Sequence, residues 1–136
     1  MINLTQHPAS PEQKEAGVED LEYGLSRLRY FLTFEEIPSP KQVRWVADRI
    51  ADLAARVGAR SAMIGGAPFL MGPLEQALSN RGIAPFYAFS KRESVEVTLP
   101  DGGVKKTQVF RHLGFVPSAS HVPTCDCEFL KDIGQY

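Results

Sequence analysis

Residues 61–90, SAMIGGAPFLMGPLEQALSNRGIAPFYAFS, decide the fold because they read as a strand, a helix and a second strand. The first apolar run is short and ends at Gly65 and Gly66. The segment that follows it has helical spacing up to a glycine, although Pro73 indicates an irregular first turn or a later start. Buried strands that alternate with helices predict a mostly parallel sheet.

A shorter strand and helix are predicted at the beginning of the chain. Residues 2–7, INLTQH, predict a first strand. Residues 10–17 predict a short helix, with Ser10 at the N-cap, Pro11 at the first helical position and Gln13 completing a capping box. The helix should therefore follow the first strand almost directly.

The clearest helix is predicted over residues 39–58. Apolar side chains recur there at helical spacing, at Val43, Val46, Ile50, Leu53 and Val57. The preceding segment is less regular, and residues 18–36 predict helical turns followed by a short strand near residues 30–34.

Residues 93–115 predict an antiparallel hairpin, because two alternating segments flank the turn sequence DGG. The elements together predict an α/β protein with a Rossmann-like three-layer fold, in which a mostly parallel sheet ends in this C-terminal antiparallel hairpin. We expect one domain over residues 1–116. Residues 117–136 lack periodicity and are expected to form a partly disordered tail or a segment that a partner orders.

Composition narrows the classes of partner. The chain has 136 residues and a net charge of −1, so no long nucleic acid is expected as a partner. Charge is uneven, however: residues 1–36 carry three cations and seven anions, whereas residues 84–116 carry five and three. A local positive surface suits a small anionic ligand. The sequence has neither an 18-residue apolar run nor a signal peptide, so we expect a cytoplasmic protein without a membrane partner.

Polar and glycine residues follow three of the predicted strands. Ligands of open α/β sheets bind beyond the carboxyl ends of parallel strands, so these residues are expected to meet in one crevice. The three strand ends carry Thr5, Gln6 and His7; Gly65 and Gly66; and Ser90, Lys91, Arg92 and Glu93.

These residues suit the binding of a phosphate. Gly65 and Gly66 would let the backbone approach phosphate oxygens at a helix N-terminus, or they only permit a tight turn. Lys91 and Arg92 could hold phosphate oxygens, or they are solvated cations at a strand end. His7 has a side chain suited to proton transfer near neutral pH, or it caps a turn.

Two further candidates lie on the last strand. By alternation, Arg111 and His112 point to opposite faces, so only one of them is expected to face the crevice. In the tail, His121, Cys125 and Cys127 have no second half that would complete a zinc site. We therefore expect neither a metal nor a cofactor.

The sequence resembles a family of small CRISPR-associated proteins of type III loci, the ring nucleases. The resemblance is strongest over residues 84–115 and thinner over the rest of residues 1–116, where the strand ending near His7 and the helix start SPEQ are also similar. Departures from the family pattern occur at Ile64 and Phe89. The residues that carry the resemblance are Tyr87, Ala88, Lys91, Arg92, Glu96, Val109, Phe110, Arg111, His112 and Phe115.

The resemblance implies a metal-independent enzyme that cleaves cyclic oligoadenylates, the second messengers of type III CRISPR systems. It also implies a two-fold homodimer with the ring on its axis, in which a ribose 2′-hydroxyl attacks the adjacent phosphate. With the strand-end residues, it makes His7, Lys91, Arg92 and Glu93 the candidate catalytic residues. The candidate ligand-binding residues are Gln6, Gly65, Gly66, Ser90, Arg111 and His112.

Two other functions fit the same sequence. One is a protein that binds the cyclic nucleotide without cutting it. The other is a different nucleotide-processing enzyme on a Rossmann-like fold, for which glycosidic-bond chemistry would need an exposed carboxylate such as Glu93.

Overall fold

The structure, a computed structural model, describes residues 1–118. Within them lies a five-stranded sheet of order β2-β1-β3-β4-β5, whose first four strands are parallel and whose last strand is antiparallel to β4. The predicted α/β fold with a C-terminal antiparallel hairpin is thus confirmed. The strands are β1 (Ile2–Asn3), β2 (Glu19–Asp20), β3 (Ser61–Ile64), β4 (Ala84–Thr98) and β5 (Val104–Pro117). The helices are α1 (Pro11–Glu15), α2 (Leu25–Leu32), α3 (Pro40–Arg56) and α4 (Pro68–Asn80).

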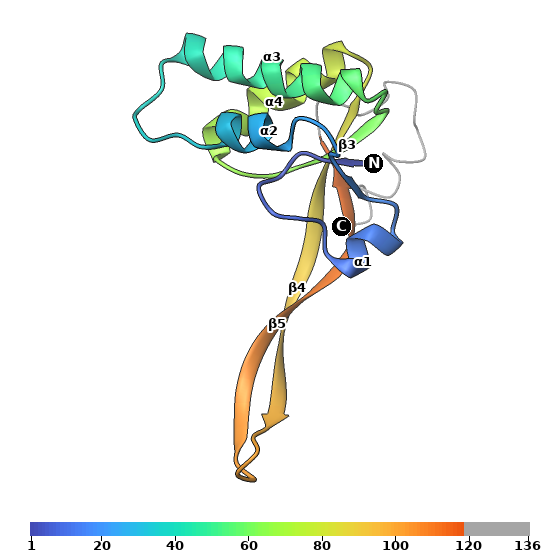
Figure 1. Cartoon of the computed structure of the whole chain (residues 1–136), viewed down its shortest axis with the longest axis vertical. Helices are drawn as coiled ribbons and strands as arrows, with labels where there is room; N and C mark the ends of the chain where they lie inside the picture. Colours follow the sequence, from blue (N-terminus) through green and yellow to red (C-terminus); the bar gives the residue numbers. More distant parts are fainter. Residues whose placement is uncertain (119–136) are drawn as a thin grey trace, which may run out of the picture.

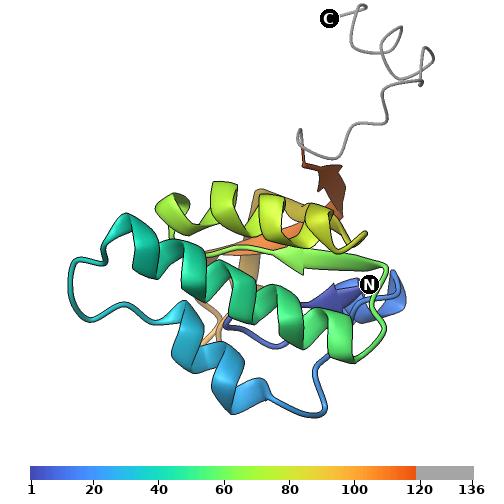
Figure 2. The same cartoon turned by 90° about the horizontal axis from the view of Figure 1, so that it is seen from above.

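The two faces of the sheet are covered unequally. Helices α2, α3 and α4 lie side by side over one face and enclose the main core with it (Figures 1 and 2). On the other face Met63 packs with Ala9 and Val18, which flank α1. Since α1 has five residues and buries none of its own side chains, this outer layer is thin. We call the two sides the helix face and the α1 face.

Local signals explain the long helices. Ser39 caps α3, and its Oγ accepts a hydrogen bond from the Gln42 N–H at 3.1 Å. The inward side of α3 is apolar, and Val43, Val46, Ile50 and Leu53 are buried as predicted. Val57, predicted in the same series, lies just after the helix and is exposed. Helix α4 begins at Pro68 and continues through Pro73, so the proline does not mark its start.

The first strand is shorter than the predicted residues 2–7. It ends at Asn3, because the Asn3 Oδ1 accepts a hydrogen bond from the Thr5 N–H at 2.9 Å and turns the chain away from the sheet. Such a side-chain turn replaces the next backbone pairing. The polar residues after the strand therefore form a loop.

The strand predicted near residues 30–34 is wrong. Leu25–Leu32 form α2 instead, and the burial of Leu28 and Leu32, four residues apart, supports a helix packed on the core. The strand of this region lies earlier, at Glu19–Asp20, and pairs with β1. Two residues give too little pattern for this strand to be recognised in the sequence.

Strand β4 does not end near Ser90 as predicted but runs to Thr98. It pairs with β3 only over Ala84–Tyr87, and beyond that it pairs with β5 alone. The ribbon thus projects from the body of the molecule (Figure 1). At about 3.3 Å per residue, the stretch from residue 88 to residue 98 reaches roughly 35 Å. We call residues 88–115 the hairpin arm.

The arm closes and returns as its turn sequence predicts. The Leu99 N–H donates to the Gly103 carbonyl at 2.6 Å, and Gly102 has φ +85°, a conformation that favours glycine. After β5 the buried Ser118 donates its N–H to the Pro85 carbonyl at 3.0 Å. Residues 119–136, with His121, Cys125 and Cys127, lie outside the described residues. None of the helices within residues 1–118 has the length and hydrophobicity needed to cross a bilayer.

Candidate functional site

A crevice of about 510 Å³ lies at the carboxyl edge of the parallel strands. The loop after β1 contributes Gln6 and His7, and the turn after β3 contributes Gly65 and Gly66. Tyr87 and Ala88 of β4 and Gln13 of α1 complete its walls. The structure therefore brings together four of the predicted site residues. The other six do not line this crevice.

A polar pair, the buried Asn3 and the partly exposed Asp20, shapes the loop that carries His7. Asn3 is buried, and its Nδ2 donates to the His7 carbonyl and to Asp20 Oδ1, each at 2.8 Å. The same carboxylate oxygen accepts the Ala9 N–H at 2.9 Å. These bonds fix both ends of the loop, so the backbone at His7 is held in place while its side chain is exposed.

Sequence reasoning missed this pair. The signal was an asparagine inside an otherwise apolar strand, but its partner Asp20 is 17 residues away and belongs to an unpredicted strand. Burial favours the neutral form of Asp20, but the hydrogen bonds from Asn3 and Ala9, together with Lys14 at 3.8 Å, outweigh it and hold the pKa of the carboxyl below its usual value. Asp20 is therefore an anion beneath the loop at neutral pH.

The turn after β3 leaves backbone groups near the crevice. Gly66 has φ +143°, which other residues rarely adopt. The following helix α4 has Ala67 at its N-cap and no side-chain cap, whereas serines cap α1 and α3. Among the described residues, the N-cap of α4 thus offers no side-chain acceptor to the first N–H groups of the helix, and such free N–H groups can bind an anion.

Gln6 has a structural contact in addition to its place in the crevice. Its Nε2 donates to the Leu32 carbonyl at 3.1 Å, which ties the loop after β1 to the end of α2. The amide therefore joins the crevice wall to the helix face.

The pleat of β4 divides its polar residues between the two faces. Ser90 and Arg92 point to the α1 face, together with His112, the partner of Ser90 in β5. Lys91 and Glu93 point to the helix face. Ser90 is three residues beyond Tyr87, so it lies roughly 10 Å further along the strand than the crevice wall. Lys91 and Arg92 therefore do not share one face within a single chain.

On the α1 face, His112 lies against α1. The backbone N–H of His112 donates to Glu12 Oε2 at 2.9 Å, and the centre of the imidazole ring lies 4.8 Å from that of the Phe115 ring. His112 and Phe115 are three residues apart in β5, and they point to the same face because β5 has a bulge opposite Phe89 and Ser90. Within residues 1–118 the buried Nδ1 of His112 has no hydrogen-bond partner.

Arg92 lies on the same face as His112, with its guanidinium carbon 5.3 Å from the centre of the Phe110 ring. Helix α1 links this group to the crevice, since Glu12 contacts His112 and the next residue, Gln13, lines the crevice. We call His112, Arg92 and Ser90 the α1-side cluster.

On the helix face, Arg111 pairs with Glu93 at 3.5 Å between Nη2 and Oε2. Lys91 lies directly opposite Arg111 in the ladder. The predicted separation of Arg111 and His112 onto opposite faces is thus present. An exposed ion pair of this kind contributes little to stability, so Glu93 and Arg111 stay available to other partners.

Tyr87 anchors β4 to α4 beside the crevice. Its hydroxyl donates to Glu75 Oε1 at 2.8 Å. Burial and this carboxylate both raise the pKa of the phenol above its usual value, so the hydroxyl keeps its proton. Over residues 1–118, His, Cys, Asp and Glu side chains form no group of three or more that could hold a metal ion.

Comparison with known proteins gives a match to a protein family. No curated protein and no solved structure matches the chain significantly. A family model, described as the Uncharacterized protein MJ1673 family, matches residues 1–116. Because that match spans well over half of the chain, the protein belongs to the MJ1673 family.

Proposed function

We propose that the protein is a ring nuclease that cleaves cyclic oligoadenylates without a metal ion. The observation that carries the proposal is that α1 contacts both the crevice and the α1-side cluster. Gln13 lines the crevice, and Glu12 accepts a hydrogen bond from the backbone of His112. The crevice offers His7 and backbone N–H groups, and the cluster adds a guanidinium and a second imidazole. The resemblance of residues 84–115 to ring nucleases supports this choice of substrate.

In the proposed reaction a ribose 2′-hydroxyl attacks the adjacent phosphorus. A bond forms between the 2′ oxygen and phosphorus, and the bond from phosphorus to the 5′ oxygen of the next nucleotide breaks. The hydroxyl proton passes to His7, and the leaving 5′ oxygen receives a proton. The products carry a 2′,3′-cyclic phosphate and a 5′-hydroxyl, so no other reactant is consumed.

The protein's task in this reaction is mostly positioning. Arg92 would stabilise the crowded, doubly charged phosphorane, which is where a preorganised cation contributes most. The start of α4 would hold a neighbouring phosphate. His112 would donate to the leaving oxygen or contact the ring. Because a bound cation and a proton acceptor suffice for this attack, we propose no metal.

The remaining predicted residues have a different place in this proposal. Lys91 and Arg111 form a second positive group on the helix face, and Glu93 is paired there. A ring that bridges two chains could meet Arg92 of one chain and Lys91 of the other. We therefore propose that the ligand lies between two copies, and not within one crevice.

The positions of Lys91 and Arg92 on opposite faces of β4 favour a second function. One chain presents only one of the two adjacent cations to any phosphate, which weakens stabilisation of a transition state but still permits binding. A protein that binds the cyclic oligoadenylate and withholds it from other receptors would need no more.

The test is to incubate the protein with cyclic tetra-adenylate and cyclic hexa-adenylate in EDTA and to separate the products by chromatography. We expect linear products that end in a 2′,3′-cyclic phosphate, and a loss of roughly 10²–10⁴-fold in rate for His7→Ala. The matched control is Arg60→Ala, which removes a cation at the opposite edge of the sheet. Intact rings that still bind would select the sequestering function, and a lack of binding would remove both functions.

A further inference from the structure

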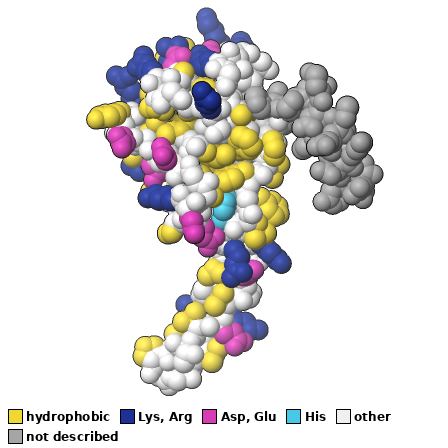
Figure 3. Space-filling model, turned by 90° about the vertical axis from the view of Figure 1, so that its right-hand side faces the viewer, with side chains coloured by type: hydrophobic (Ala, Val, Ile, Leu, Met, Phe, Trp, Pro, Cys, Tyr) yellow, Lys and Arg dark blue, Asp and Glu magenta, His cyan; other side chains and the backbone are white. Residues whose placement is uncertain are grey.

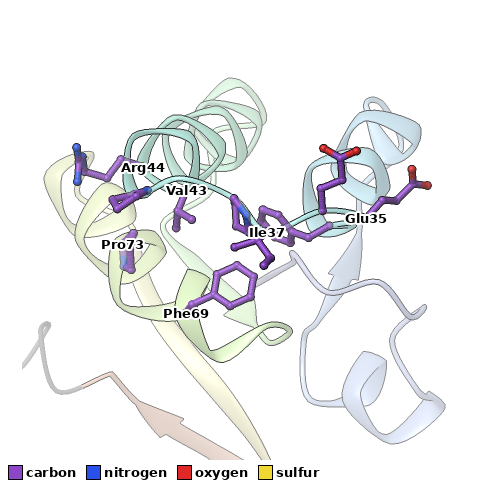
Figure 4. Close-up of a pocket in the computed structure, with 10 residues that line it drawn as sticks. Glu35, Ile37, Val43, Arg44, Phe69 and Pro73 are labelled. Carbon is purple, nitrogen blue, oxygen red and sulfur yellow. The ribbon is translucent and has the colours of Figure 1, made fainter.

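An apolar groove of about 790 Å³ lies away from the crevice, between residues 34–38 and the first turns of α3 and α4 (Figure 4). Phe34 and Phe69 meet edge to face within it, with ring centres 4.9 Å apart. Ile37 lies at its lip and is 99% exposed. An apolar hollow with such a lip is typical of a surface that another molecule covers.

The hairpin arm also exposes apolar side chains, and towards its tip more of them lie on one side than on the other. Val95, Val97 and Leu99 alternate on the helix face of β4, and Val109 of β5 shares that face. The opposite side carries mostly polar residues at the same level, although Val104 and Phe110 are exposed there. Figure 3 shows apolar side chains along the arm and a band of charged ones where it meets the body. This alternation is typical of a ribbon with one side covered.

The rest of the same chain, as far as residue 118, does not cover the arm. Its tip lies at the far end of the molecule's long axis, remote from the helices (Figure 1), and residues of two of those helices, α3 and α4, line the groove. A two-stranded hairpin standing alone in water is only marginally stable. Both surfaces, the groove and the apolar side of the arm, therefore lack a partner within the described residues.

Charge indicates that the two surfaces fit each other. Residues 84–116, which contain the arm, carry five cations and three anions, and Lys105 and Lys106 lie close to its tip. The lining of the groove carries two anions, Glu35 and Glu36, and one cation, Arg44. An arm that entered a groove would bring apolar side chains together and place lysines near glutamates.

We propose that the hairpin arm of one chain docks in the groove of a second copy, and that the second arm docks in the first groove. Since each copy supplies both surfaces, the exchange closes as a two-fold dimer. The roughly 35 Å reach of the arm allows it to cross to a neighbour. Because the contact occurs twice, each groove needs to bury only about half of the ~1,200–2,000 Å² typical of a stable interface.

This interface goes beyond the proposed chemistry and does not rest on it. It uses the apolar side of the arm and not the crevice or the α1-side cluster, whose residues lie at the base of the arm on its other side, and its tests contain no nucleotide. A failure of the arm–groove contact would leave the cleavage experiment standing, and a failure of cleavage would leave the contact standing. A chain that stays monomeric even with the ring bound would, in addition, exclude a ligand held between two copies.

Disulfide trapping tests the contact directly. Cys125 and Cys127 are first replaced by serine, and Ile37→Cys and Val97→Cys are made in separate chains, one with a mass tag. We expect a disulfide between the two chains only when both variants are mixed and oxidised. A dimer of Val97→Cys with itself would mean that arms pair with arms, and it would overturn the proposal. The absence of any cross-linked species would overturn it too.

Sedimentation of the full chain measures the strength of the contact. We expect Val97→Asp to raise the dimer dissociation constant at least about tenfold, whereas Val57→Asp should not change it. The two valines are similarly exposed, 43% and 46%, but Val57 lies outside both surfaces, and circular dichroism verifies that both variants fold. A wild-type chain that stays monomeric at high concentration would contradict the proposal, as would binding of the arm to vesicles or duplex DNA in place of dimerisation.

Charge reversal separates a specific contact from loose hydrophobic association. Glu35→Lys with Glu36→Lys should weaken the dimer, and adding Lys105→Glu with Lys106→Glu should restore it. A loss that the second pair of changes fails to restore would show that the glutamates and lysines do not meet.

Discussion

The body of the molecule and its hairpin arm use the same kind of sequence in opposite ways. In the body, alternating or clustered apolar residues end up buried, as Ala62 and Ile64 do beneath the helices. In the arm, Val95 and Val97 alternate just as regularly and stay exposed. Periodicity therefore predicts which side of a strand seeks cover, but it does not tell whether the same chain supplies that cover.

The sharpest way to test this contrast is to shorten one leucine in each region. Leu74 of α4 is 0% exposed and Leu99 of the arm is 38% exposed. We expect Leu74→Ala to lower the free energy of unfolding by about 2–5 kcal/mol, because it leaves a cavity in a packed core. In dilute protein Leu99→Ala should cost less than about 1 kcal/mol, since its site is half open to water. Urea denaturation followed by circular dichroism measures both changes, and equal losses would show that the arm is part of the cooperative core.

The polar pair of Asn3 and Asp20 gives the next largest effect. Asn3→Ala removes the donor to the His7 carbonyl and to Asp20, and it leaves both part-buried acceptors without that bond. We expect a loss of about 1–3 kcal/mol in the free energy of unfolding. The control Gln76→Ala removes an exposed amide bond to Asn80 and should change stability by no more than about 0.5 kcal/mol. Similar effects for the two variants would mean that the pair does not hold the loop.

Replacement of a glycine by alanine should raise stability at one position and lower it at another. Gly72 lies within α4 with open space around it, so Gly72→Ala should stabilise the body by about 0.5–1 kcal/mol. Gly102 has φ +85° in the turn of the arm, so Gly102→Ala should cost about 1 kcal/mol. We expect the loss from Gly102→Ala to be measured as faster amide hydrogen exchange within the arm alone, since a projecting hairpin can open locally. Slower folding or faster exchange throughout the body would contradict that independence.

The smallest expected effect is a pH dependence that arises in the body. The pKa of Asp20 is lower in the folded protein than its ordinary value of 3.8, so the folded state favours the carboxylate. Its contribution to stability is complete above the unfolded pKa and is lost as pH falls through the folded one. Urea midpoints should therefore decline below about pH 4, and Asp20→Asn should flatten that slope. The exposed Glu15→Gln is the control, and an unchanged slope in Asp20→Asn would rule out this assignment.

Much of the candidate site could be predicted because its parts follow strands. Parallel strands end at one edge, so the positions of His7, Gly65 and Gly66 in the sequence sufficed to bring them together. Lys91 and Arg92 were harder to place, because polar residues read as the end of a strand. Both sides of a two-stranded ribbon are in contact with water, so polar residues such as Lys91 and Arg92 do not end the strand. The pleat of the strand then points these two adjacent side chains to opposite faces.

Local chemistry alone determined α1, α3 and the turn of the arm, because a serine cap, a proline at the first position and a glycine at positive φ act within a few residues. Contacts between distant segments decided the rest. The pairing of β1 with the two-residue β2, the bond from Asn3 to Asp20 and the bulge that places His112 beside α1 depend on residues 17 to 100 positions apart. No short stretch of sequence records such contacts, because each exists only once the chain has folded.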